Sequence, residues 1–598
     1  MELKVALAQI KVVSGDLEGN TNRILEGIQK AIDEKVDIVV FPETAITHYC
    51  CGDLFFHDSF IDKQLDYLYN KIIPFTIGQN ICVVLGFIDK RGKSKDDYPI
   101  LYNSCGIIQD GKMEIYDKIL LAKRGQHEDV RYFEPGSKIK SFNLIKKDGE
   151  IIKWSPIICQ DMWSNECDRD IVKECVDNGS QLVIVINQSY FHFGKQDVRK
   201  KIISDHCVSN NISMVYLNAV AVGDITKNIM IYNGGSFACN TSGNILVECN
   251  NFKEDFKICN IEDTIPKSND ALNSRINLYT KKNLSKHEKY EEIFNALSFC
   301  VKEFLSVCGL KTPMVYLSGG IDSSVVAAIV ANAFDKDNII FVSSPTEDNG
   351  DITKRNAQMT ADALGIKLHW VSMQSAYDGY IKDYKDAFYE EPSPISKAAF
   401  QAVGRTAQSI GISHKFGSVG NIGCSNQTEN ILGFSSFHDV ANSSALGLIN
   451  DITKIELYEF AEFINQRYGR EIINPGLYNG IIKPMAELND NKGADPFEYY
   501  LYAPICSALI RHRMDVKEII ECFKIKRLNQ DEFINWRNNK TIYENVTLEE
   551  FEIATLRCFE LSKRSVFKSA QSGPTPLISP ISRGFSSREC LINKYNPL

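Results

Sequence analysis

The residues with the clearest chemical potential form a glycine-rich turn, Ser318-Gly319-Gly320-Ile321-Asp322-Ser323-Ser324, between a strand-like run and an apolar helical pattern. Gly319 and Gly320 let the backbone turn sharply and approach a ligand without a Cβ clash. The turn opens a helix, whose free N–H groups and dipole favour an anion. Because no G-x-x-x-x-G-K-[ST] loop is present, Mg²⁺ and other cations must neutralise the phosphates, and Asp322 is a candidate Mg²⁺ ligand. The turn therefore predicts a phosphate site.

The turn resembles the pyrophosphate-binding loop of the ATP pyrophosphatase family, whose members activate an acid as an adenylate that a nitrogen nucleophile then attacks. Within that family the NAD synthetases fit best. The further matching segments are Ser344-Pro345-Thr346, Cys424 to Glu429, Lys483 to Leu488 and Phe567 to Gln571. The resemblance implies ATP binding by Ser318, Gly319, Gly320, Ile321, Asp322, Ser323, Ser324 and Cys424.

The same resemblance implies a binding site for deamido-NAD and ligands for Mg²⁺. It assigns deamido-NAD to Glu429, Phe434, Lys568 and Arg405, and Mg²⁺ to Asp322 and Glu429. Four positions depart from the family pattern, namely Ala399, Val403, Cys424 and Gln427. These departures leave open which carboxylic acid the site activates.

In the first half of the chain, Glu43, Lys118 and Cys159 each lie at or just after a strand-like run, and together they resemble the nitrilase superfamily. A cysteine thiol, with a pKa of about 8.5, is mostly protonated at pH 7. Attack on an amide therefore needs a base, so Glu43 would take the thiol proton and pass it to leaving ammonia. Lys118 would stabilise the oxyanion. Water would then hydrolyse a Cys159 thioester.

The resemblance also assigns a pocket for glutamine. Ser189 and Lys195 match family positions that contact glutamine, and Arg124 stands where the family has a tyrosine. Asp129 stands where nitrilase-type domains often have a second glutamate. We therefore expect Ser189, Lys195 and Arg124 to bind glutamine, while the role of Asp129 stays open.

Together, the two halves resemble glutamine-dependent NAD synthetases along almost the whole chain. The resemblance implies that glutamine, ATP and deamido-NAD are substrates, and that NAD, AMP, pyrophosphate and glutamate are products. It also implies a homo-oligomer. An alternative remains open at this point: another glutamine- and ATP-dependent amide ligase that acts on a different carboxylic acid.

The elements that must position these residues indicate two α/β domains. A chain of 598 residues is too long for one ordinary core. Up to about residue 260, apolar β-branched runs alternate with polar helical stretches, and the resemblance implies a nitrilase-like α-β-β-α sandwich. The strand–turn–helix–strand order from residue 313 predicts a doubly wound parallel sheet. We expect domains at 1–263 and 287–598, a linker at 264–286, and an extended tail from Ser569.

Composition argues against several other classes of protein and of binding site. A net charge of −9 argues against a broad nucleic-acid-binding surface. No apolar run approaches the roughly 18 residues that span a bilayer, and the N-terminus reads as a strand instead of a signal peptide, so we expect a cytoplasmic protein. The 18 cysteines form no CxxC pair, which disfavours zinc-ribbon and thioredoxin-like sites.

Overall fold

The computed structural model describes residues 2–123, 126–145, 149, 151–163, 167–225, 227–262, 284–417, 419–434, 438–441, 443–484, 495–512, 514–528, 542–569 and 571–579. The chain folds into two compact units. The N-terminal unit comprises Met1–Ile225 and Met230–Ser285, and the C-terminal unit comprises Thr226–Ile229 and Lys286–Leu598. Most of the predicted linker, 264–283, lies outside the described residues, so the domain boundaries stay predictions.

Two six-stranded sheets form the N-terminal unit. The first has the order β14-β1-β2-β3-β4-β5, with bounds Asp255–Glu262, Glu2–Gln9, Ile38–Val40, Cys82–Lys93, Pro99–Gln109 and Lys112–Asp117. The second has the order β13-β12-β9-β8-β7-β6, with bounds Ile245–Glu248, Phe237–Cys239, Ser213–Asn218, Leu182–Asn187, Ile151–Ile158 and Phe142–Ile145. The central strands of each sheet are parallel and the outer ones antiparallel.

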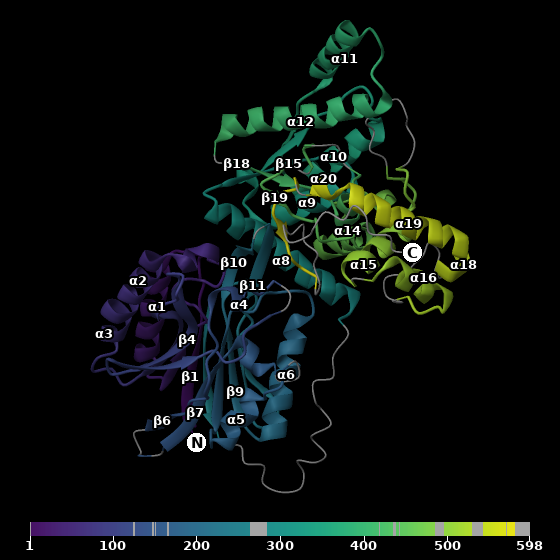
Figure 1. The fold of residues 1–598 in the computed structure, drawn as a ribbon. Helices are drawn as coiled ribbons and strands as arrows, with labels where there is room; N and C mark the ends of the chain where they lie inside the picture. The colour runs from purple at the N-terminus through teal and green to yellow at the C-terminus, as the bar shows by residue number, and fades with distance from the viewer. Residues whose placement is uncertain are drawn as a thin grey trace. The chain divides into compact units, whose positions relative to one another are not determined.

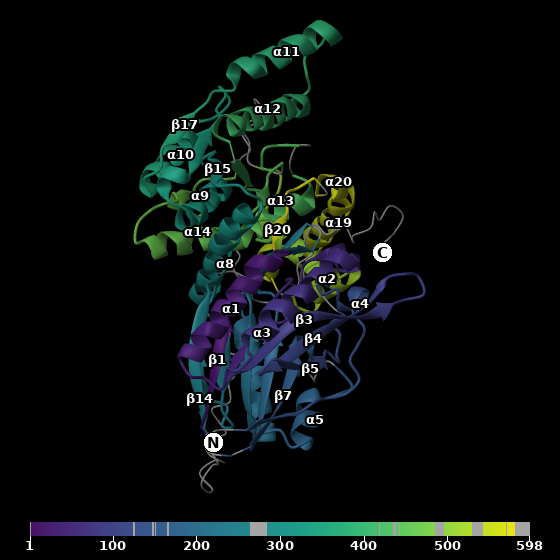
Figure 2. The ribbon, with the colours of Figure 1, turned by 90° about the vertical axis from the view of Figure 1, so that its left-hand side faces the viewer.

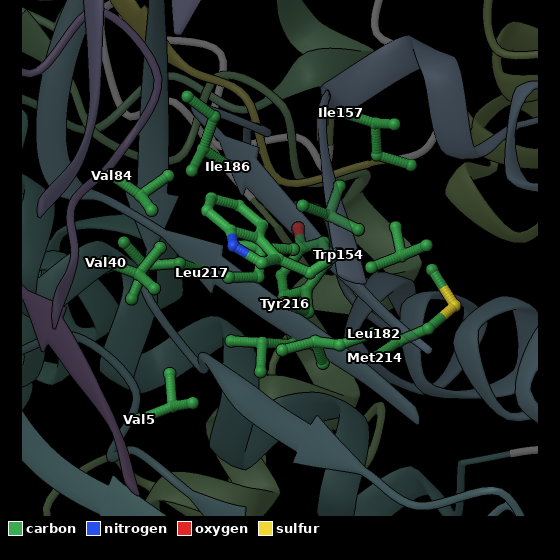
Figure 3. Packing of buried hydrophobic residues seen from close by; sticks show 14 of the residues in the cluster. Val5, Val40, Val84, Trp154, Ile157, Leu182, Ile186, Met214, Tyr216 and Leu217 are labelled. Carbon is green, nitrogen blue, oxygen red and sulfur yellow. The ribbon is translucent and has the colours of Figure 1, made fainter. Parts of the chain in front are cut away.

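The inner faces of these two sheets pack on each other. Figure 3 shows Val5, Val40 and Val84 of the first sheet in one cluster with Trp154 and Leu182 of the second. Each such fully buried aliphatic side chain contributes roughly 1.5–3 kcal/mol to folding. The outer faces are covered by α1 (Leu17–Asp33) on one sheet, and by α5 (Ile171–Asp177) and α6 (Lys195–Asn210) on the other (Figure 1). The predicted α-β-β-α sandwich is confirmed.

Shorter elements complete the N-terminal unit. They are η1 (Gly52–Phe56), α2 (Asp58–Tyr67), η2 (Leu68–Ile72), α3 (Ile73–Phe75), α4 (Asp129–Tyr132), η3 (Cys159–Met162), β10 (Val220–Ile225) and the part of β11 (Asn228–Asn233) that begins at Met230. Among them, α4 and η3 each begin at a residue that matters for the site described below, Asp129 and Cys159.

The C-terminal unit is built on a five-stranded parallel sheet with the order β17-β16-β15-β18-β19. Its strands are Leu368–Trp370, Ile340–Ser343, Thr312–Tyr316, Val419–Gly423 and Leu446–Gly447. Strand order reverses between β15 and β18, and ligands of open α/β sheets bind at such a switch point, outside the carboxyl ends of the strands. The predicted doubly wound sheet is confirmed.

Helices cover this sheet and form a second apolar cluster. The helices of the unit include α8 (Lys286–Val307), α9 (Ile321–Ala333), η6 (Lys336–Asn338), α10 (Asp351–Leu364), α11 (Gln374–Phe388), α12 (Pro394–Phe416), α13 (Gln427–Leu432), α14 (Lys454–Tyr468) and η7 (Pro475–Leu477). Figures 1 and 2 show α11 beyond α12, away from the sheet. A cluster around Ile505, Phe523 and Phe551 joins α15 (Tyr499–Ile510), α16 (Val516–Lys524) and α19 (Leu548–Arg564).

The last elements are α18 (Ile542–Asn545), α20 (Val566–Ser569) and β20 (Thr575–Pro576). The part of the predicted tail that the structure describes ends at Ser579. There, the buried Asp451 carboxylate accepts hydrogen bonds from the backbone N–H groups of Ile578 and Ser579, both at 3.0 Å. Within the described ranges, no helix combines the length and the apolar character that crossing a membrane requires.

Candidate active sites

Cys159 stands at a sharp turn directly after the parallel strand β7, where it begins η3. Its φ of +45° is a left-handed conformation that non-glycine residues rarely adopt. The thiol is buried, and burial raises its pKa, with a further rise from the Glu43 charge. The thiol is therefore protonated at neutral pH, and its attack on an amide needs a nearby base.

Glu43 follows β2 and is almost completely buried. Its Oε1 accepts hydrogen bonds from Asn103 Nδ2 at 2.7 Å and from Lys118 Nζ at 2.8 Å. Its Oε2 accepts one from the backbone N–H of Gln188 at 2.7 Å. Sequence reasoning did not assign roles to Asn103 and Gln188; the position of Asn103 within β4, a mostly buried strand, was the available signal.

Lys118 follows β5 and lies between two carboxylates. Its Nζ is 2.8 Å from Glu43 Oε1 and 2.8 Å from Asp129 Oδ2. Burial lowers the pKa of Lys118, but the charges of Asp129 and Glu43 outweigh burial, so the pKa lies well above its usual value. Asp129 also accepts hydrogen bonds from Tyr49 Oη and from the Ala122 N–H. The shorter Asp129 side chain thus reaches the lysine directly.

The structure brings Glu43, Lys118, Asp129 and Cys159 together. The charges of Glu43, Lys118, Asp129 and Lys195 all act on the Cys159 thiol. Cys159 and Gln188 follow the neighbouring parallel strands β7 and β8 and so leave the second sheet at the same edge, whereas Glu43 follows β2 of the first sheet. The arrangement supplies a nucleophile, a base and a cation.

The predicted glutamine pocket lies next to β8. Ser189 is buried two residues after β8, and the fully buried Arg199 of α6 donates from Nη2 to the Ser189 carbonyl at 2.6 Å and to its hydroxyl at 3.2 Å. Lys195 begins α6 and donates from Nζ to the Tyr190 carbonyl at 2.8 Å. The prediction for Arg124 falls outside the described residues. Arg199, which sequence reasoning missed, holds the Ser189 segment in place.

The glycine-rich turn of the C-terminal unit lies between β15 and α9. Gly319 has φ of +89°, and a Cβ there would lie 2.0 Å from the Thr353 carbonyl oxygen. The Gly320 N–H donates to Ser318 Oγ at 3.3 Å, and Ser323 Oγ lies 3.1 Å from Ser318 Oγ. Ile321 begins α9, so the turn sits at a helix N-terminus. Only glycine fits at position 319.

The last serine of the motif is placed differently from the others. Ser324 is fully buried, and its hydroxyl accepts a hydrogen bond from Thr360 Oγ1 at 3.3 Å. Ser318, by contrast, is exposed at the start of the loop. The side chain of Ser324 therefore packs between α9 and α10, and its backbone N–H donates to the Gly320 carbonyl at 3.2 Å.

Asp322 and Glu429 converge on one cation. Lys454 Nζ lies 2.6 Å from Asp322 Oδ2 and 2.9 Å from Glu429 Oε1, while Asn426 Nδ2 donates to Asp322 Oδ1 at 2.7 Å. Burial, followed by the Asp322 charge, raises the pKa of Glu429. Mg²⁺ prefers oxygen ligands, so these two converging carboxylates are the residues that would hold it. Among the described residues, no group of three or more His, Cys, Asp or Glu side chains is placed to hold a metal by itself.

The predicted deamido-NAD residues fall into two places. Phe434 follows Gly433 in the chain, and the Gly433 carbonyl accepts a hydrogen bond from Lys568 Nζ at 2.9 Å. The Phe434 N–H donates to the Glu429 carbonyl. Arg405 lies elsewhere, on α12, and donates from Nε to the Ser344 carbonyl at 3.0 Å. The structure thus joins Glu429, Phe434 and Lys568 but places Arg405 beyond the end of β16.

The positions that depart from the family pattern also have distinct surroundings. Cys424 follows β18, and burial raises the pKa of its thiol. Gln427 is buried and donates from Nε2 to Asp451 Oδ1 at 3.1 Å, so its side chain points into the unit. Ala399 and Val403 lie one turn apart on α12, where Val403 is exposed.

Sequence comparisons match both units. The carbon-nitrogen hydrolase family model matches residues 4–265, and the NAD synthase model matches residues 293–541. A glutamine-dependent NAD(+) synthetase from Thermotoga maritima is 27% identical over 545 residues, which cover 86% of this chain and 90% of that protein. One from Synechocystis is 26% identical over 537 residues, again 86% of this chain and 90% of that protein.

Solved structures share the fold along the chain. A glutamine-dependent NAD(+) synthetase from Cytophaga hutchinsonii has a TM-score of 0.77 at 17% identity, covering 99% of this chain and 98% of that one. The enzyme from Acinetobacter baumannii, solved with adenosine diphosphate, has a TM-score of 0.69 at 22% identity with the same coverage. At 17% and 22% identity, the similarity to these two structures shows a shared fold alone.

Proposed function

We propose that this chain carries out one amidation with its two sites. The chain joins a carbon-nitrogen hydrolase domain to an NAD synthase domain, and it is related along most of its length to glutamine-dependent NAD(+) synthetases. Its function is that of a glutamine-dependent NAD(+) synthetase, a carbon-nitrogen ligase. Ammonia released from glutamine replaces AMP on adenylated deamido-NAD, giving NAD. AMP, pyrophosphate and glutamate are the other products.

One observation carries this proposal. The same chain holds a buried Glu43–Lys118 pair that acts on the Cys159 thiol, and a glycine-rich phosphate loop at a sheet switch point. The first site releases ammonia and the second uses ATP to consume it. Relatives named glutamine-dependent NAD(+) synthetases match over 86% of the chain, so the similarity extends over both units.

In the first half-reaction, Cys159 attacks the side-chain amide carbon of glutamine while Glu43 takes the thiol proton. The carbon–nitrogen bond breaks, Glu43 returns the proton to the leaving nitrogen, and a thioester and ammonia result. Water, deprotonated by Glu43, then cleaves the thioester to glutamate. Lys118 stabilises the oxyanion in both steps because its neighbouring carboxylates keep it protonated. Ser189, Lys195 and Arg124 would orient glutamine.

In the second half-reaction, residues 318–323 hold the phosphates of ATP at the N-terminus of α9. Asp322 and Glu429 would hold Mg²⁺, which neutralises the charge of the departing pyrophosphate when bound. Lys454, already paired with both carboxylates, adds a second cation next to the phosphates. Phe434, Lys568 and Arg405 would contact deamido-NAD, with Cys424 next to ATP.

Product analysis tests this function directly. The protein is incubated with glutamine, ATP, Mg²⁺ and deamido-NAD, and NAD, AMP and glutamate are measured. Matched reactions replace deamido-NAD with other carboxylic acids, because Ala399, Val403 and Gln427 depart from the family pattern. The relatives favour deamido-NAD over the alternative acids. Amide formation from another acid, with none from deamido-NAD, would refute the assignment.

We also propose a homo-oligomer, with α11 and α12 at an interface between copies. None of the side chains of α11 is buried, and apolar residues of this helix pair are exposed at Phe388, Ile395 and Ile410. Exposed apolar area of this kind is typical of interaction surfaces. Light scattering should give a mass above one chain of 67.5 kDa, and Ile395→Asp should lower it. A monomeric wild type would contradict the proposal.

A further inference from the structure

The Asp161 carboxylate lies two residues after Cys159, is fully buried, and accepts four hydrogen bonds. Its Oδ1 accepts the backbone N–H groups of Ile119 at 3.2 Å and Leu120 at 2.7 Å. Its Oδ2 accepts the Tyr116 hydroxyl at 2.8 Å and the Ile158 N–H at 3.0 Å. None of the roles proposed above for the amide-hydrolysing site uses this group.

The four donors belong to two separate segments. Tyr116, Ile119 and Leu120 surround Lys118 at the end of β5, whereas Ile158 precedes Cys159 at the end of β7. These two strands belong to different sheets of the sandwich. A single carboxylate therefore ties the backbone that carries the oxyanion-stabilising cation to the backbone that carries the nucleophile.

We propose that Asp161 is a positioning residue for amide hydrolysis, which holds Cys159 and Lys118 in register across the two sheets. The inference rests on the proposed glutaminase function of this unit. Asp161 acts through its neighbours: its oxygens are occupied by backbone and tyrosine donors, so it needs no contact with glutamine. The left-handed turn at Cys159 requires such support, because a strained backbone persists only where its surroundings hold it.

A carboxylate is the side chain that this position requires. It offers acceptors on both oxygens and no donor, which matches three N–H groups and one O–H group. An asparagine has only one side-chain oxygen. Its NH₂ group, a donor, would therefore face N–H donors of either the Lys118 segment or Ile158. Burial raises the pKa of Asp161 to about 6, because a carboxylate removed from water is less favourable in its charged form. If this side chain only filled space, an apolar residue of similar volume would do so without the desolvation of a buried charge.

The test is Asp161→Asn in the full-length chain. Glutamate released from glutamine is measured without deamido-NAD, and NAD formed from added ammonia is measured separately. We expect kcat for glutamine hydrolysis to fall by about 100-fold, the loss typical of a misplaced catalytic group. We expect KM for glutamine and the ammonia-driven rate to stay unchanged, because neither depends on the alignment of Cys159 with Lys118.

Three further variants accompany this test. Tyr116→Phe removes one donor to Asp161 but keeps the three backbone contacts, and it should retain most of the glutaminase activity. Asp177→Asn removes a carboxylate from the exposed surface of α5, where it pairs with Lys173, and should match the wild type. Asp161→Glu keeps the charge but shifts the carboxylate by one methylene, so it should lower kcat as well.

An unchanged kcat in Asp161→Asn, or in Asp161→Glu if the first variant does not accumulate, would overturn the proposal. A parallel rise in KM would also overturn it, because that result would place Asp161 in the glutamine pocket. An equal loss of the ammonia-driven rate would overturn it as well, because the role of Asp161 would then be a general structural one. A wild type that releases no glutamate from glutamine would instead refute the proposed function.

Discussion

At the scale of single residues, the amide-hydrolysing site depends on buried charges that compensate one another. Glu43, Lys118 and Asp129 are each at most 1% exposed, and the lysine contacts both carboxylates. Removing one partner of such a buried set typically costs about 3–5 kcal/mol, because the remaining charge has no partner. The same arrangement keeps Lys118 protonated, which an oxyanion-stabilising group requires, so stability and chemistry constrain the same three residues.

Replacing Cys159 with alanine should separate the two activities. We expect glutamine-driven NAD formation to fall by roughly 10,000-fold or more, because no nucleophile remains for the thioester. Ammonia-driven formation should persist, since the C-terminal unit contains the ATP loop. Both rates are measured by NAD released from deamido-NAD. If ammonia-driven synthesis were lost as well, the two activities would not be separable in this way.

Replacing Asp322 with alanine should remove both routes to NAD. The change takes away one of the two carboxylates that converge on Lys454, and with it a proposed Mg²⁺ ligand, so we expect a loss of roughly 100-fold or more. Glutamine hydrolysis without ATP should continue. Asp337→Ala, at the exposed turn η6, is the matched control. Substantial synthesis by Asp322→Ala would remove this residue from the Mg²⁺–ATP role.

At the scale of elements, both sites are built where parallel strands end. Cys159 and Gln188 directly follow β7 and β8, while Ser318 and Cys424 follow β15 and β18. Neighbouring parallel strands release their chains at the same edge of a sheet, so residues far apart in sequence meet there. The turn after β15 then starts α9, which adds the N–H groups of a helix N-terminus.

Gly319→Ala tests the geometry of this turn. A left-handed φ of +89° costs a non-glycine residue about 1–3 kcal/mol, and the added Cβ would lie 2.0 Å from the Thr353 carbonyl oxygen. We expect the loop to shift, KM for ATP to rise and NAD synthesis to fall by at least about 10-fold. Glutamine hydrolysis is the internal control. The exposed Gly411→Ala on α12, where a Cβ meets nothing within 4 Å, should leave synthesis unchanged.

At the scale of the whole molecule, one unit makes ammonia and the other consumes it. Ammonia that enters bulk water at neutral pH is protonated and loses its nucleophilic lone pair. We therefore propose that ammonia passes between the sites without mixing with the solvent.

A competition experiment tests this transfer. Isotope-labelled glutamine is supplied with an excess of unlabelled ammonium, and the label in the NAD amide is measured. We expect most of the amide nitrogen to come from glutamine. Dilution of the label in proportion to the added ammonium would show free exchange and contradict protected transfer.

The sequence by itself determined the parts of this protein that depend on local chemistry. The Ser318–Ser324 motif predicted the turn at the start of α9, because glycine conformation and helix N-termini are local properties. The apolar β-branched runs of the first 260 residues predicted strands, and the buried strands β2 and β8 and the buried first part of β3 are among those that the structure contains. The resemblance to known families assigned Glu43, Lys118 and Cys159 to one site, although no local pattern links positions so far apart.

Only the tertiary structure decided which side chains share an environment. Asp129 contacts Lys118 because α4 begins beside β5, and Asp161 links two sheets because two strand ends meet across the sandwich. Ser324 packs against Thr360, and Lys454 lies between Asp322 and Glu429. These relations join residues from separate elements, so they follow from how sheets and helices pack, which hydrophobic periodicity and turn chemistry along the chain do not specify.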